Sequence, residues 1–273
     1  MKMAQYLRGV GLATAFLLLI SCGGVTEKDS APDRVPDVSQ IPDAVPKVEP
    51  RSKYGNPSQY EVFGKNYYTM NSAEGYQKKG IASWYGTKFH GRRTSSGEIY
   101  DMYAMTAAHK TLPLPTYVEV TNLENGRTVV VKVNDRGPFH DNRLIDLSYS
   151  AATKLGIVDK GTGMVEVRAI TPGKLQKTAT RPPSEAVTPP GKSVGSAAMF
   201  LQVGAFSSRH RAEQVKSRLQ QDIAGTVFIE TLPQQQGTLY RVRIGPLASV
   251  SDGDSLAARL AGLGFRDSHI VID

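Results

Sequence analysis

The chain has 273 residues, with 33 Lys and Arg against 25 Asp and Glu and a formal net charge of +8. This length suits two small domains, each with its own core, and the positive charge is too dispersed along the chain to predict a nucleic-acid-binding surface. The single cysteine, Cys22, excludes a disulfide framework and a cysteine metal site within the chain.

The first residues have the pattern of an export signal. A basic start precedes an apolar run from Val10 to Ile20, which is too short to span a bilayer comfortably, and Leu-Ile-Ser stands directly before Cys22. This pattern resembles bacterial lipoprotein signals, which implies that residues 1–21 are a signal peptide and that Cys22 carries the lipid that tethers the chain to a membrane. Gly23, in place of the aspartate of inner-membrane retention, implies the outer membrane. An ordinary signal peptide with a chance cysteine is the alternative.

Two segments poor in large side chains divide the rest of the chain. Residues 22–75 begin with proline every few positions, and residues 171–196 are rich in Pro, Thr and Ser. Such composition buries too little apolar surface to fold. We therefore expect a disordered tether over 22–75 and a linker over 171–196, with folded domains at 76–170 and 197–273.

The first domain alternates short apolar runs with turn signals, which indicates strands and little helix. Strands are expected over residues 80–85, 116–121, 128–133 and 163–170. Asn125-Gly126 predicts a β-hairpin with a type I′ turn. After Asp146 we expect a helix, with Ser148 as its N-cap and Gly156 near its end. This pattern favours a small, mainly-β barrel over a parallel layered sheet.

The second domain has the order βαββαβ, in which each half runs strand, helix, strand. This order typically builds a ferredoxin-like (RNP-like) α+β sheet with two helices on one face. The other face is left open as a binding surface, and we expect Gln202, Phe206, Tyr240 and Arg243 to line it. RNA-binding sheets share the order, but the export signal excludes nucleic acid as the partner.

Three polar side chains of the first domain are candidates for catalysis. Asp135 lies in VNDRGPF, directly after an apolar strand, and Glu98 and His109 lie upstream, so all three are expected to converge on one groove. Cleavage of a glycosidic bond requires a carboxylic acid that donates a proton to the leaving oxygen, and we assign this role to Asp135. Pairing with Arg136 would oppose that role. Taken singly, Glu98 and Asp135 also fit ordinary turns, and His109 fits a buried structural histidine.

Aromatic side chains next to these candidates offer faces for a sugar ring. Trp84 and Tyr85 are expected to bind substrate in this way, together with Arg136, although Trp84 fits a half-buried core position equally well. The sequence has no HxxxH-like metal spacing, so neither a metal nor a cofactor is expected.

With both domains placed, the chain resembles the RlpA (rare lipoprotein A) family. The motifs that carry the resemblance are GIASWYG at 80–86, TSSGEIYD at 94–101, TAAHKTLPLP at 106–115, VNDRGPF at 133–139, FLQVGAF at 200–206 and YRVRIGPL at 240–247. The resemblance implies a double-psi β-barrel at 76–170 and a SPOR domain at 197–273.

The same resemblance implies an activity and a location. It implies an endolytic lytic transglycosylase, a carbon–oxygen lyase that cleaves peptidoglycan strands lacking stem peptides, with Glu98, His109 and Asp135 as its acid–base set. The acid and the base are not distinguished. The SPOR domain implies targeting to the division septum, and the lipid on Cys22 implies an outer-membrane lipoprotein that faces the periplasm. A non-catalytic septal peptidoglycan-binding lipoprotein is the alternative, and a hydrolase is a third reading.

Overall fold

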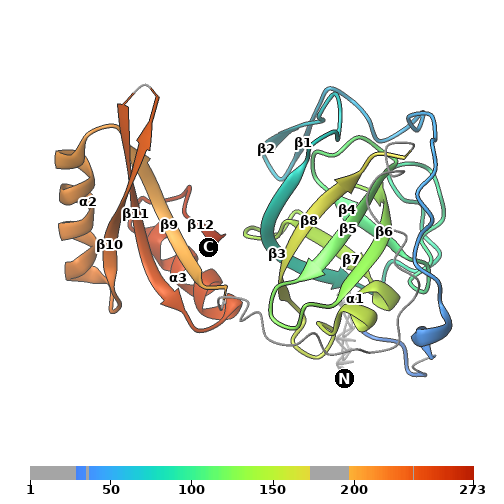
Figure 1. The fold of residues 1–273 in the computed structure, drawn as a ribbon. Coiled ribbons are helices and arrows are strands. Elements are labelled where there is room, and N and C mark those ends of the chain that lie inside the picture. The colour runs from blue at the N-terminus through green and yellow to red at the C-terminus, as the bar shows by residue number, and fades with distance from the viewer. Residues whose placement is uncertain (1–28, 35–36, 173–196, 236) are drawn as a thin grey trace, which may run out of the picture.

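The computed structural model describes residues 29–34, 37–172, 197–235 and 237–273. They form two domains, a closed β-barrel and a four-stranded sheet with two helices (Figure 1). The expected signal peptide, Cys22 and all but the first two residues of the expected linker lie outside the described residues. In the part of the chain that is described, no helix combines the length and the apolar character needed to cross a membrane.

The N-terminal domain is a barrel of six strands. In chain order these are β3 (Gln77–Tyr85), β4 (Thr106–His109), β5 (Thr116–Asn122), β6 (Thr128–Asp135), β7 (Ile145–Ser148) and β8 (Gly163–Ile170). Around the barrel the order is β3-β7-β4-β6-β5-β8, with β3 and β7 parallel and β4 and β6 parallel. The expected small barrel is confirmed. Because β4 and β6 run in parallel, the residues that follow them meet at one end of the barrel.

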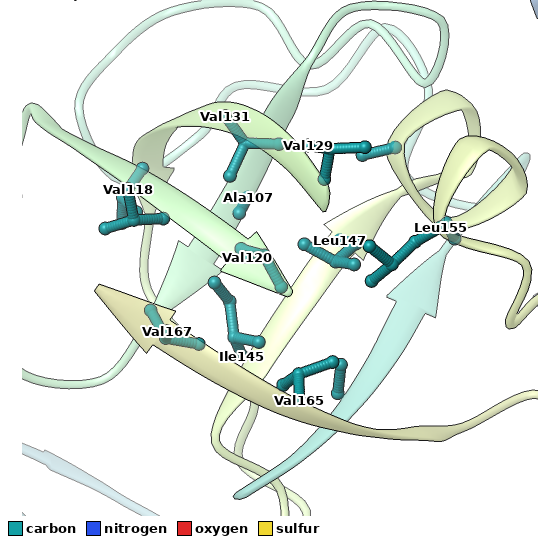
Figure 2. Close-up of a cluster of buried hydrophobic side chains, with 14 of the residues drawn as sticks. Ala107, Val118, Val120, Val129, Val131, Ile145, Leu147, Leu155, Val165 and Val167 are labelled. Atoms are coloured by element: carbon teal, nitrogen blue, oxygen red, sulfur yellow. The ribbon is translucent and has the colours of Figure 1, made fainter. Parts of the chain in front are cut away.

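Alternating side chains fill the barrel interior (Figure 2). The inward positions carry Val118, Val120, Val129, Val131, Ile145, Leu147, Val165 and Val167, all at most 1% exposed. Leu155 of helix α1 (Tyr149–Leu155) packs against the same cluster. Full burial of each such side chain contributes roughly 1.5–3 kcal/mol. This core fixes the ends of the strands, where the polar candidates lie.

Two local predictions in this domain have different outcomes. Helix α1 starts at the N-cap Ser148 and ends at Gly156, which is left-handed with φ +77°, so both predicted caps are confirmed. Strands β5 and β6 form the predicted hairpin. Its turn is not type I′, because Gly126 has a positive φ (71°) while Asn125 does not. The Gly126 N–H instead donates to the carbonyl of Asn122, which closes a longer loop.

The segment before the barrel is folded onto it, in contrast to the tether expected over residues 22–75. It contains a 3₁₀ turn, η1 (Val38–Gln40), and a hairpin of β1 (Gln59–Val62) and β2 (Lys65–Tyr68). Figure 1 shows it running along the barrel, with the hairpin at one end. Polar contacts hold it there: Asp43 with Lys154 and Val130, Glu49 with Tyr117 and Lys132, and Asn56 with Leu114. The expected tether was inferred from the small number of large apolar side chains, and that composition gives no information about such polar contacts.

The C-terminal domain has the predicted order βαββαβ. Its elements are β9 (Met199–Phe206), α2 (Arg209–Asp222), β10 (Val227–Gln234), β11 (Gly237–Leu247), α3 (Val250–Gly262) and β12 (His269–Ile272), and the sheet order is β10-β11-β9-β12. Leu219 of α2 and Leu260 of α3 are both buried in one cluster with Leu201, Val242 and Ile244. Both helices therefore cover the same face, as predicted.

Candidate active site

Asp135 stands at the end of β6 and is held by one of its two carboxyl oxygens. Its Oδ1 accepts hydrogen bonds from the backbone N–H of Ser95 (2.7 Å), the Ser95 hydroxyl (2.6 Å) and the backbone N–H of Arg136 (2.7 Å). Among the described residues, Oδ2 has no hydrogen-bond partner. The carboxyl group is therefore fixed in place while one oxygen stays available to a substrate.

Backbone irregularities on both sides of Asp135 aim its side chain. The pairing of β6 with β4 skips Asn134, so two residues of β6 stand opposite one of β4. A bulge of this kind bends a strand and redirects the side chain that follows. On the other side, Gly137 has φ +137°, which glycine adopts far more readily than other residues. The NDRG sequence thus produces a strand end that turns sharply.

Ser95 reaches Asp135 because the TSSGE motif forms a tight turn against the end of β6. The N–H of Thr94 donates to the carbonyl of Glu98 (2.8 Å), which closes the turn, and the N–H of Ser96 donates to the carbonyl of Asn134 (3.2 Å). The sequence motif was recognised, but Ser95 itself was not among the candidates. Its closeness to Asp135 depends on a contact between residues 40 positions apart.

Glu98 lies at the end of this turn and ties it to β6. Its Oε1 accepts from the Lys132 ammonium (2.8 Å) and its Oε2 from the amide of Asn134 (2.8 Å), with the side chain 44% exposed. Burial alone would lower the pKa of Lys132, but its bonds to Glu98 and Glu49 raise it. Glu98 and Asp135 are thus brought to the same turn, residues 94–98.

The ring of His109 is turned into the protein, away from solvent. Its Nδ1 accepts from the backbone N–H groups of Thr111 (3.1 Å) and Leu112 (3.0 Å), so Nε2 carries the proton and donates to the Tyr76 hydroxyl (2.8 Å). The residue is 3% exposed, and burial, followed by the charges of Lys110, Arg136 and Lys78, lowers its pKa to about 3. The structure therefore places a neutral, fully hydrogen-bonded histidine here, and only its backbone approaches the turn after Asp135.

Arg136 does not pair with Asp135. Its guanidinium donates to the carbonyls of Gly55 (2.8 Å), His109 (3.0 Å) and Leu112 (2.6 Å), and it lies over the Tyr60 ring at 5.9 Å from the centroid. The guanidinium therefore makes no hydrogen bond to the carboxyl group, although the two charges still attract, since the charge of Asp135 opposes the burial that lowers the pKa of Arg136. Arg136 instead joins the N-terminal segment to the turn that follows β4.

A cavity of about 390 Å³ lies beside this arrangement. It is lined by Gly55, Pro57, Tyr60, Val62, Ser95, Arg136 and Phe139. Ser95 and Arg136 both donate hydrogen bonds to Asp135, so the candidate acid lies directly behind the lining of the cavity without being part of that lining. Tyr60 was missed from the sequence because it lies in the segment assigned to the tether. The combination of aromatic residues with glycine at 54–68 is the signal that could have found it.

The aromatic residues predicted to stack on sugar lie in the core. Tyr85 is 7% exposed and stacks on Tyr100, with ring centroids 4.0 Å apart, and burial raises its pKa well above the ordinary value. Trp84 is half-buried, packs against the barrel core and meets Tyr149 edge to face at 5.7 Å. For Trp84 the structure thus favours the core alternative. Neither residue lines the cavity beside Asp135.

The four residues expected on the open face of the C-terminal sheet lie on two different sides. Gln202 and Arg243 pair across β9 and β11 and line a cavity of about 670 Å³ that lies between the two domains, with Lys78, Lys79 and Arg143 of the barrel on its other side. The sheet face expected to be open therefore faces the barrel. Phe206 and Tyr240 pack against the cluster on the helix-covered side. A register shift between Val242 and Arg243 explains why Phe206 lies on the helix-covered side. One extra residue in β9 at this point reverses the side to which the later residues of the strand point.

Comparison with known proteins bears on both domains. A family described as lytic transglycolase matches residues 77–167, and the SPOR domain family matches residues 195–272. The chain is 42% identical to the endolytic peptidoglycan transglycosylase RlpA of Pseudomonas aeruginosa, over 87% of this chain and 83% of that protein. It is also 42% identical to the protein of the same name from Vibrio cholerae, over 89% and 86%. The crystal structure of the RlpA SPOR domain from Pseudomonas aeruginosa aligns with 27% of this chain and 96% of its own, at 32% identity and a TM-score of 0.26.

Proposed function

The chain belongs to the RlpA family, and we propose that its barrel is an endolytic peptidoglycan lytic transglycosylase with Asp135 as the acid. One observation carries the assignment of the acid. Asp135 is clamped through Oδ1 by Ser95 and the Arg136 backbone, while Oδ2 has no partner within the described residues, and the same Ser95 and Arg136 line a cavity. A fixed carboxyl group with one free oxygen is what proton transfer to a glycosidic oxygen requires.

The reaction follows from this geometry with a single acid. A protonated Asp135 donates its proton from Oδ2 to the glycosidic oxygen as that oxygen leaves C1 of the muramic acid residue. The C6 hydroxyl of the same sugar attacks C1, and its proton returns to Asp135. The product is an anhydro sugar end, and no water is consumed. Attack within one sugar avoids the entropy cost of bringing in a second molecule.

Glu98 and His109 support this reaction as positioning residues. Glu98 holds the turn that carries Ser95 through its bonds to Lys132 and Asn134. His109 shapes the turn after β4, whose carbonyls bind Arg136. With both nitrogens of His109 occupied inside the protein, proton exchange with the substrate falls to Asp135.

The C-terminal SPOR domain supplies the location. We propose that it binds glycan strands that lack stem peptides, through the sheet face that carries Gln202 and Arg243, and so concentrates the barrel at the division septum. Lipid on Cys22 would anchor the protein in the outer membrane, facing the periplasm. The basic start, short apolar run and cysteine of the sequence support this anchor.

Purified protein incubated with amidase-treated sacculi tests the activity. We expect soluble fragments with anhydro ends, identified by mass spectrometry, and fewer of them from sacculi that keep their stem peptides. Absence of fragments at every pH, with retention of the protein on the sacculi, would support the non-catalytic wall-binding alternative instead.

A further inference from the structure

Aromatic rings from two separate segments form one wall next to the candidate acid. Tyr60 on β1 and Tyr67 on β2 stack with ring centroids 5.3 Å apart. Phe139, from the turn after Asp135, meets Tyr60 at 6.2 Å and Tyr67 at 5.6 Å. The hairpin thus packs on the very turn that begins with the catalytic acid.

Two of the three rings of this wall line the cavity next to Asp135, and Tyr67 supports them from behind. Tyr60, Val62 and Phe139 line the cavity together with Ser95 and Arg136. The Tyr60 hydroxyl donates to the carbonyl of Lys110 (2.7 Å), and the Arg136 guanidinium lies over its ring, so the ring is held from two sides. The volume of the cavity, about 390 Å³, lies within the range of about 300–1,000 Å³ that is usual for small-molecule sites.

The tip of the hairpin exposes a large aromatic side chain in an unfavourable conformation. Phe63 is 89% exposed and has φ +50°, and Gly64 after it has φ +74°. These are the φ signs of a type I′ turn, in which Asn and Gly are preferred and a bulky residue is disfavoured. Phe63 follows Val62, which lines the cavity. An exposed apolar ring held in this way gains nothing in the free protein and points to a binding role.

The hairpin also precedes residues 77–167, which match the lytic transglycolase family. Because the family match does not include the hairpin, it gives no indication of what the hairpin does. Its register is complete from Gln59–Tyr68 to Val62–Lys65, so it is a formed structural element.

We propose that the β1–β2 hairpin and Phe139 form a saccharide-binding subsite that holds one pyranose ring of the glycan strand beside the bond that Asp135 cleaves. A pyranose presents an apolar face of axial hydrogens, which fits an aromatic wall, while its hydroxyl groups face outward to water. Ser95 and Arg136 line the same cavity and donate hydrogen bonds to Asp135, so they fix the position of the bound sugar ring relative to the acid. The inference rests on the proposed function and names one of its substrate contacts.

Two measurements on the full-length protein test the subsite. The first is the KM and kcat for anhydro-fragment release from soluble, peptide-free glycan strands, compared among wild type, Tyr67→Ala, Phe63→Ala and Tyr60→Phe. The second is binding of a short peptide-free glycan oligosaccharide to chains that also carry Asp135→Asn, followed through the backbone amide signals of residues 59–68. Phe89→Ala is the matched control, because Phe89 is an exposed aromatic residue of the same barrel (40%) whose ring meets Tyr85 and not the rings of the hairpin.

We expect Tyr67→Ala and Phe63→Ala to raise KM about five- to tenfold each, with kcat changed less. Tyr60→Phe keeps the ring and should stay within about twofold of wild type. The amide signals of the hairpin should shift on addition of oligosaccharide. Thermal unfolding shows whether each variant folds. If Tyr67→Ala does not fold, the KM of Phe63→Ala still tests the subsite, because Phe63 is exposed and its replacement leaves the core unchanged.

The outcomes separate the two proposals. Normal KM values for both alanine variants, together with unshifted hairpin amides, would overturn the subsite while wild-type fragment release keeps the transglycosylase. Shifted amides without any fragment release from wild type would keep the subsite and overturn the activity.

Discussion

The acid of the barrel and the arginine of the C-terminal sheet are held in opposite ways. Asp135 receives only neutral donors on one oxygen, and the neighbouring cation, Arg136, is turned to backbone carbonyls. Arg243 is 3% exposed and is neutralised on both sides, by Asp273 at 2.7 Å and Glu230 at 3.1 Å. The carboxyl group proposed as the acid thus has no salt-bridge partner among the described residues, whereas the buried cation of the sheet is paired.

The surroundings of Asp135 and the C-terminal sheet should also differ in how strongly a single substitution affects the function of each. The proposed catalytic geometry depends on a few hydrogen bonds to the carboxyl group of Asp135. The cavity at the sheet is larger, about 670 Å³, and Gln202 and Arg243 share its lining with residues of the barrel. Substitutions in the barrel should therefore affect turnover steeply, and substitutions in the sheet should affect wall retention gradually.

The largest effect is expected from Asp135→Asn. The amide keeps the shape of the side chain but has no acidic proton to transfer to the leaving oxygen, so fragment release should fall by about a thousandfold or more. Retention on sacculi and the melting temperature should stay near the wild-type values. Asp101→Asn, at an exposed acid of the same domain, is the control and should cleave normally. Cleavage by Asp135→Asn at the wild-type rate would show that another group is the acid.

A smaller effect is expected from Ser95→Ala, which removes the hydroxyl that donates to Asp135 at 2.6 Å and leaves the backbone donor in place. Loss of the hydrogen bond that holds Oδ1, and with it the orientation of Oδ2, should lower kcat about ten- to a hundredfold with little change in KM. Ser95→Thr keeps a hydroxyl and should restore part of the rate.

Ser96→Ala is the neighbouring control for this experiment. The Ser96 hydroxyl contacts Thr94, not Asp135. Equal losses for Ser95→Ala and Ser96→Ala would point to general loosening of the turn and would contradict the positioning role of Ser95.

Arg243→Gln should separate location from chemistry. It leaves Asp273 without its partner and weakens the tie to Glu230, so we expect several-fold weaker retention on sacculi and a loss of about 1–3 kcal/mol in domain stability. Cleavage of soluble strands should be unchanged. Arg218→Gln, on helix α2, is the control, because Arg218 packs over Phe265 away from the open face. Unchanged retention of the Arg243 variant would exclude this face from wall binding.

The smallest effect on turnover concerns His109, whose contribution should appear as pH-dependent stability. Its ordinary pKa is 6.5, and burial lowers the pKa to about 3 in the folded state. Between these values the unfolded chain takes up a proton that the folded chain does not, so the free energy of unfolding should fall as the pH drops from 6.5 towards 3. The decline should amount to a few kcal/mol and should be absent above pH 6.5.

His109→Gln provides the comparison. The glutamine does not titrate, so the difference in stability between wild type and variant should shrink on acidification, as followed by chemical denaturation at several pH values. A difference that stays constant from pH 7 to pH 4 would show that His109 is not held neutral by burial.

More of the fold than of the candidate site could be predicted from the sequence. Strand periodicity, the caps at Ser148 and Gly156 and the βαββαβ order are local signals, and the structure confirms them. Asp135 was also identified locally, from a strand that ends in NDRG. Alternation along β11 already places Tyr240 and Arg243 on opposite sides.

The features that could not be predicted depend on contacts between residues far apart in the sequence, which no local pattern indicates. Ser95 meets Asp135 across 40 positions, and Asn56 meets Leu114 across 58. The extra residue in β9 that redirects Phe206 is a property of strand pairing. Proline-rich composition at the start of residues 22–75 concealed a hairpin whose aromatic residues complete the cavity. His109 has a suitable side chain for catalysis, and only the fold reveals that its ring points inward.

The central claim is that a sugar hydroxyl, and not water, replaces the leaving oxygen while Asp135 carries the proton. Cleavage of peptide-free strands in water labelled with the heavy isotope of oxygen, followed by mass spectrometry, tests it most directly. The account predicts fragments lighter by one water than hydrolysis products, with no label in the newly formed ends. Newly formed reducing ends that carry the label would contradict it.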